Sequence, residues 1–161
     1  MAEALKGIYN RRHPGEWVVL ALSEAKNGKG YISPYIIPRI LRAYFRRNGK
    51  LLKFLVQSAN WTIEEYFTGA TEIEGGYTGG LYCIHSKGSL FNYHPHIHAL
   101  VPAGLMKDGL FYEQRDISTP VIAEIFRARL LTVLLKQGVI TQELINMLMS
   151  WNRHSGFNSL P

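Results

Sequence analysis

Three histidines occupy every second position in the stretch "FNYHPHIHALVPAGL", residues 91–105. Residues two apart on a β-strand point to the same face, so His96 and His98 would present their imidazoles side by side, with Ile97 facing the core behind them. Two neighbouring imidazoles bind Mg²⁺, Mn²⁺ or Zn²⁺ and leave coordination positions open for a substrate. The pattern therefore predicts a divalent-metal site, in which Mg²⁺ or Mn²⁺ is expected and Zn²⁺ is the alternative ion.

Further candidate ligands lie near this pair. His94 shares the same face only if the strand extends back through Pro95, and proline often marks the start of a strand. His85 ends the preceding apolar run and would lie beside the pair if the two runs form a hairpin, as a third ligand or a phosphate contact. Glu72 and Glu74 are weaker candidates. Histidines that only stabilise a hairpin are the alternative interpretation.

A basic surface is predicted on the helical segment that precedes these strands. Between Ser33 and Ile63 the chain has no acidic residue. A solvated helix usually mixes charges of both signs to form ion pairs one turn apart, and a stripe of one sign gives up those pairs. Phosphates would supply the missing counter-charge and would position DNA without reading its sequence. The predicted DNA-binding residues are Arg39, Arg42, Arg46, Arg47, Lys50 and Lys53, and an ordinary exposed face is the alternative.

Composition narrows the class of protein. The chain has 161 residues, 47% of them apolar and 19% charged, which is typical of one globular domain. A net charge of +6 favours a polyanionic partner, although it also serves solubility. The sequence contains neither an apolar run of the ~20 residues that span a bilayer nor a signal-like start, so a soluble, cytoplasmic protein is expected. With Cys83 as the one cysteine, internal disulfides and a zinc ribbon built on cysteines are excluded, and His, carboxylate or amide ligands are expected.

The elements that must hold these residues follow from hydrophobic spacing and turn signals. We predict an α+β fold in a single domain, residues 1–161, in which helices pack on a small antiparallel sheet that carries the histidine strand. The expected elements are a strand over residues 16–23, a loop over 24–34, a helix over 35–67 that is either continuous or broken at Gly49, strands over 80–85 and 95–102, a turn with a short strand over 107–114, and helices over 118–138 and 141–151.

Several blocks in order resemble one family of enzymes. The block "HPHIHALVPAG" resembles the His-hydrophobe-His (HUH) motif of rolling-circle insertion-sequence transposases, the IS-ninety-one-type or two-tyrosine family. The segment "IPRILRAYFRRNGKLLKFLVQSANWTIEEYF" is similar to the arginine-rich helix of that family, and "CIHSKGSLFNYHPHIH" to the segment that enters its histidine block. The segment "LLKQGVITQELINMLMSWNRHSGFN" resembles the end of its central region, so the resemblance covers about residues 17–158.

This resemblance implies cleavage and joining of single-stranded DNA in transposition. By position, His96 and His98 match the ligands of a divalent metal that polarises the scissile phosphate, while His94 and His85 match family histidines of less defined role. A tyrosine hydroxyl would attack and leave a 5′-phosphotyrosine and a 3′-OH. The implied partners are single-stranded or hairpin DNA, together with a full-length transposase or further copies of this chain, and no membrane.

Two departures from the family pattern change the expectation. The cysteine-rich zinc module that usually opens the family is absent, and the nucleophilic tyrosines normally follow the "HSGFN" block, where this sequence ends at "SLP". None of the nine tyrosines matches the nucleophile, and Tyr93, expected in the loop before the histidine strand, is interpreted as structural. We therefore expect the central portion of a transposase, in which strand cleavage is incomplete. The alternative is a non-catalytic DNA-binding remnant of a truncated transposase.

Overall fold

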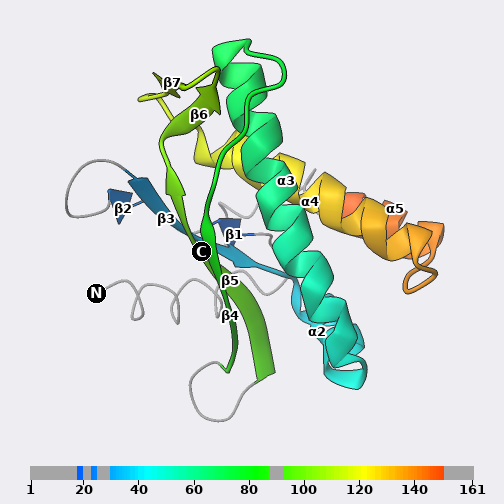
Figure 1. The fold of residues 1–161 in the computed structure, drawn as a ribbon. Helices are drawn as coiled ribbons and strands as arrows, with labels where there is room; N and C mark the ends of the chain where they lie inside the picture. Colours follow the sequence, from blue (N-terminus) through cyan, green and yellow to red (C-terminus); the bar gives the residue numbers. More distant parts are fainter. Residues whose placement is uncertain (1–17, 20–22, 25–29, 88–92, 151–161) are drawn as a thin grey trace, which may run out of the picture.

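The computed structural model of this chain describes residues 18–19, 23–24, 30–87 and 93–150 (Figure 1). These residues form helices and two small antiparallel sheets, which confirms the predicted α+β class. The elements in chain order are β1 (Val18–Val19), β2 (Ser23–Glu24), β3 (Gly30–Ile36), α2 (Arg39–Arg47), the 3₁₀ turn η1 (Gly49–Leu51), α3 (Leu52–Thr71), β4 (Leu81–Lys87), β5 (Tyr93–Pro102), β6 (Gly104–Lys107), β7 (Leu110–Glu113), α4 (Thr119–Lys136) and α5 (Gln142–Ser150).

The histidine strand β5 lies inside the main sheet. The strand order is β1-β3-β5-β4 with every pairing antiparallel, and β2 also pairs with β3. Ile97 at the middle of β5 is opposite Tyr35 of β3 on one side and opposite Ile84 of β4 on the other. Hydrogen bonding to a neighbour on both sides fixes the direction of each side chain on β5. β6 and β7 form a separate hairpin.

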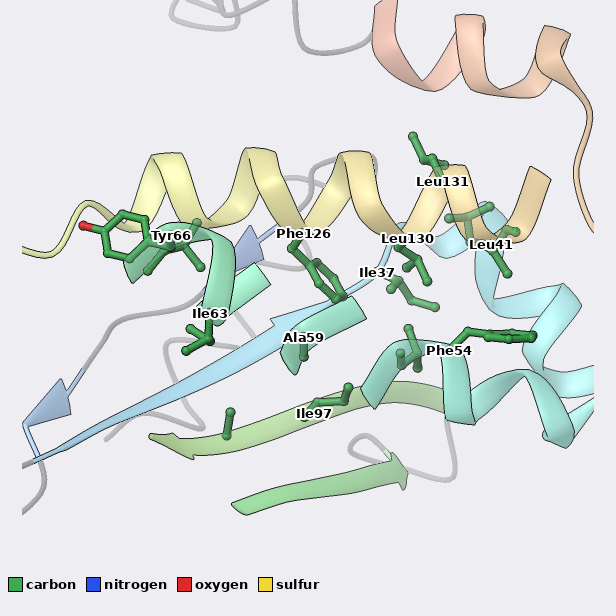
Figure 2. Packing of buried hydrophobic residues seen from close by; sticks show 14 of the residues in the cluster. Ile37, Leu41, Phe54, Ala59, Ile63, Tyr66, Ile97, Phe126, Leu130 and Leu131 are labelled. Carbon is green, nitrogen blue, oxygen red and sulfur yellow. The ribbon is translucent and has the colours of Figure 1, made fainter. Parts of the chain in front are cut away.

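The core lies between this sheet and the helices. Ile97, Ala99 and Val101 alternate along β5 and are buried, which places them on one face of the sheet. Ala59 and Ile63 lie one turn apart on α3, and both are buried in the same cluster. Figure 2 shows α3 between Ile97 of the sheet and α4. The histidines of β5 therefore point to the face of the sheet opposite α3.

The sequence pattern misses the strand β3. The pattern predicts a loop over residues 24–34 and a helix from Tyr35, whereas a strand runs to Ile36 and α2 begins at Arg39. Glycine and proline within "GYISPYI" suggest a loop, because proline lacks the N–H that a strand ladder needs. Pro34 is opposite His98 of β5, and on its other side it lies between the residues that pair with β1 and those that pair with β2.

The predicted helices are confirmed, with one refinement of their bounds. The segment expected over residues 35–67 is two helices, because the chain leaves helical geometry at Asn48, whose side chain accepts a hydrogen bond from the Lys50 backbone N–H. The helices expected over 118–138 and 141–151 are α4 and α5, with Gly138 at a φ of +64° ending the first. Of the strand expected over 16–23, the structure describes Val18–Val19 and Ser23. No helix among the described residues combines the length and apolar character that crossing a bilayer requires.

Candidate metal centre and basic surface

Three histidines from two paired strands meet on one face of the sheet. His85 of β4 is directly opposite His96 of β5, and His98 follows two residues later on β5. One ligand nitrogen from each of the three lies within 4.8 Å of the other two. Nitrogens that share one ion at bonds of ~2.1 Å are at most ~4.2 Å apart, so small side-chain rotations bring all three onto a single ion. We call His85, His96 and His98 the histidine cluster.

The cluster extends from the protein interior to the surface. His96 is 2% exposed, His98 is half-buried and His85 is exposed. Their rings are close, with centroids 5.3 Å apart for His85 and His96, 4.4 Å for His85 and His98, and 5.0 Å for His96 and His98. A buried ligand holds an ion in place, while exposed ligands leave a route for a substrate to approach it. This arrangement suits a centre with open coordination positions.

His94 contributes its backbone to this arrangement. The His96 Nδ1–H donates a hydrogen bond to the His94 carbonyl oxygen, with the two atoms 2.7 Å apart. In the neutral tautomer that donates from Nδ1, the lone pair lies on Nε2, which is then the metal-binding atom of His96. Such a hydrogen bond is the usual way in which a ligating imidazole is oriented. The His94 ring is buried and, like exposed Glu72 and Glu74, is outside the cluster.

The tyrosines on the two cluster-bearing strands face the other way. Tyr82 of β4 is opposite Ala99, which belongs to the core face, and Tyr93 alternates with His94 at the start of β5. Both tyrosines pack against the core. Burial raises the pKa of each hydroxyl, and for Tyr82 the nearby charge of Glu64 raises the pKa further. Tyr93 is the first residue of β5 and does not lie in the preceding loop, contrary to the sequence prediction. Because both side chains are on the core face, neither hydroxyl points toward the histidine cluster.

Five of the six predicted DNA-binding residues form an exposed basic surface. They lie on α2, on η1 and in the first turn of α3, and we call Arg39, Arg46, Arg47, Lys50 and Lys53 the basic surface. None of these five takes part in an ion pair with another described residue. Arg46 and Arg47 also complement the C-terminal end of the α2 dipole. The basic surface begins shortly after Ile36, the residue of β3 that is opposite His96.

Arg42, the sixth residue, is buried. Its Nε–H donates to the Ile37 carbonyl oxygen at 3.3 Å, at the connection from β3 to α2. Burial, followed by the nearby charge of Arg39, lowers the Arg42 pKa to about 10, so its guanidinium stays charged at neutral pH. Arg42 follows Leu41 in the sequence and lies at the margin of the apolar face of α2. The aliphatic stem of its side chain adds to the packing there. Arg42 therefore differs from the exposed set.

This difference predicts unequal effects on stability when Arg42 or Arg39 is replaced. We expect Arg42→Ala to lower the free energy of unfolding by about 1–2 kcal/mol, because it removes buried packing and a charged hydrogen bond. Arg39→Ala, on the exposed face, should change it by less than about 0.5 kcal/mol. Urea unfolding followed by circular dichroism measures both, and equal values for the two variants would contradict the burial of Arg42.

Comparison with known proteins places the chain in a family. Residues 79–159 match a family model described as "Putative transposase". No curated protein and no solved structure matches the chain. The matched range contains β4, β5, α4 and α5, and with them the histidine cluster, whereas the basic surface precedes it. Because the match covers 81 (79 to 159 inclusive) of the 161 residues, the chain belongs to this transposase family.

Proposed function

We propose that this chain acts in DNA transposition as the metal-binding part of a His-hydrophobe-His site that cleaves and joins single-stranded DNA. The observation that carries this proposal is the convergence of three imidazoles from β4 and β5 within 4.8 Å. Membership of a transposase family supports the role in transposition. Three nitrogen donors suit a divalent transition metal, and three ligands leave positions open for phosphate oxygens.

In this proposal, the residues of the chain hold and orient the scissile phosphate. A bound metal supplies charge neutralisation at the phosphate oxygens. His96 is fixed by its hydrogen bond to the His94 carbonyl oxygen, and His85 and His98 complete the ligand set at the open side. The basic surface would bind neighbouring phosphates and position the strand relative to β5. Each of these contributions favours the ordered placement on which phosphoryl transfer depends.

The attacking hydroxyl is assigned to a residue outside β4 and β5. Tyr82 and Tyr93 pack on the core face, so the tyrosine would come from another part of the protein, from a full-length transposase or from a second copy. Its oxygen would bond to phosphorus, its proton would leave to a base or to water, and the 3′ oxygen would depart as a 3′-OH. The resulting 5′-phosphotyrosine keeps the energy of the phosphodiester, so the same reaction in reverse joins the ends.

A second candidate function is DNA binding without catalysis. The observation that favours it is that the basic surface lies before the matched family region, while the tyrosines of β4 and β5 face away from the cluster. Under this alternative, binding of single-stranded or hairpin DNA depends on salt but is independent of metal. The two functions therefore predict different effects of metal on DNA affinity.

Fluorescence anisotropy with labelled single-stranded, hairpin and duplex oligonucleotides tests the two functions. We expect Mn²⁺ to raise the affinity of the protein for single-stranded DNA by about tenfold, because the bound ion would contact a phosphate; this gain corresponds to about 1.4 kcal/mol of binding free energy. The variant His96→Ala/His98→Ala should lose this gain, while Glu72→Ala/Glu74→Ala, whose exposed carboxylates lie outside the cluster, should keep it. DNA binding that is equal with and without Mn²⁺ would favour the non-catalytic alternative.

A further inference from the structure

A fourth ligand-type side chain lies beside the histidine cluster. The register of β4 and β5 places His85 opposite His96 and Cys83 opposite His98. Directly opposed residues of an antiparallel pair have their Cβ atoms ~4.5–5.5 Å apart and share a face of the sheet. Cys83, His85, His96 and His98 therefore stand at the four corners of a rectangle on one face. Three of the corners already form the histidine cluster.

We propose that Cys83 is a fourth ligand of the metal centre and makes it a His₃Cys site. The Cys83 sulfur is outside the group of atoms that lie within 4.8 Å, and a rotation about its Cα–Cβ bond is needed to reach the same ion. Both common χ1 rotamers are populated on strands, and Cys83 is exposed, so its side chain has room for this rotation. On binding, the thiol releases its proton to solvent and the sulfur forms the metal bond.

The ligand set determines which metal the centre prefers. Three imidazoles and one thiolate, without a carboxylate among them, are soft to borderline donors. Such a set favours Zn²⁺, or Co²⁺ as its spectroscopic substitute, over Mg²⁺, which prefers oxygen ligands. The centre would therefore select a transition metal. With four protein ligands in place, a phosphate oxygen would bind as a fifth ligand, a coordination number that zinc sites reach during catalysis. This inference rests on the metal-binding part of the proposed function and does not depend on strand cleavage.

Cobalt spectroscopy on the full chain tests the inference directly. Metal-depleted protein is titrated with Co²⁺ alone, and its visible and near-ultraviolet absorption is recorded. We expect visible d–d bands together with a near-ultraviolet thiolate-to-cobalt band. Cys83→Ser, which exchanges only sulfur for oxygen, should keep the d–d bands and lose the near-ultraviolet band. Cobalt bound to the unchanged protein without the near-ultraviolet band would overturn the role of Cys83 alone. Absence of any cobalt binding would overturn this inference and the metal centre together.

Alkylation provides an independent measurement, because Cys83 is the single cysteine of the chain. We expect Zn²⁺ to slow the reaction of iodoacetamide with Cys83 by about tenfold or more, since a metal-bound thiolate is a poorer nucleophile, and a chelator should restore the rate. In His96→Ala/His98→Ala the thiol should react at the same rate with and without Zn²⁺. An alkylation rate of the unchanged protein that Zn²⁺ leaves unaltered would overturn the inference.

Discussion

Replacing His96 and His98 together with alanine is expected to weaken Zn²⁺ or Mn²⁺ binding by roughly a hundredfold or more, which isothermal titration calorimetry measures. The reason is geometric. These two residues supply two of the three nitrogens that lie within 4.8 Å of one another, and the third, from His85, is on an exposed side chain. The ligand groups that remain, the exposed His85 imidazole and the exposed Cys83 thiol, would hold an ion only weakly against water.

Two control variants separate the ligands from their surroundings. His94→Gln keeps the backbone carbonyl that orients His96, so metal affinity should stay within about fivefold of that of the unchanged protein if the role of His94 is to orient its neighbour. Glu72→Ala/Glu74→Ala should leave metal binding unchanged. Full affinity in His96→Ala/His98→Ala, with circular dichroism unchanged, would mean that the ion binds elsewhere.

Neutralising part of the basic surface is expected to weaken binding of single-stranded DNA by about 100-fold near 0.1 M salt, if each removed charge contacts one phosphate. The variant Arg39→Gln/Arg46→Gln/Lys50→Gln removes three exposed charges that have no described ion-pair partner. The slope of log affinity against log salt concentration should become shallower by about 2, since each phosphate contact on a single strand contributes about 0.7. Anisotropy titrations at several salt concentrations give both quantities.

A matched variant distinguishes a surface from net charge alone. Arg115→Gln/Arg129→Gln/Lys136→Gln removes the same number of exposed positive charges from the β7–α4 connection and from α4. If α2 and η1 contact the strand, this second variant should lose much less affinity and keep most of its salt slope. Equal losses in the two variants would show that the overall charge, and not the basic surface, attracts DNA.

Much of the fold could be predicted from spacing in the sequence. The two-residue period of His96, Ile97 and His98 requires one face for imidazoles and one for the core, and β5 has this arrangement. The strand β3 could not be found in this way, because Pro34 is compatible with a strand only where its missing N–H is not needed. Whether it is needed depends on how β1, β2 and β5 pair with β3, and the pairing partners of a strand are not written in its own sequence.

The candidate site shows the same division between local and long-range information. His85 lies near His96 and His98 because of the register of the β4–β5 hairpin. Local spacing suggests this hairpin, and the pairing of His85 with His96 fixes its register. As the single cysteine of the chain, Cys83 predicts neither a disulfide nor a cysteine-based zinc ribbon, although its position two residues before His85 places it on the same face. Arg42 recurs at the same spacing as the exposed arginines, but it lies at the margin of the apolar face of α2. Whether a residue at this margin is buried depends on what packs against it.

The central claim is that the metal held by the histidine cluster contacts a DNA phosphate. The most direct measurement is electron–nuclear double resonance of the full chain loaded with Mn²⁺ and saturated with single-stranded DNA, because coupling of ³¹P to the manganese electron spin requires a phosphate next to the ion. We predict a ³¹P coupling in the unchanged protein that is absent in His96→Ala/His98→Ala. Protein-bound Mn²⁺ without any ³¹P coupling at saturating DNA would contradict the claim.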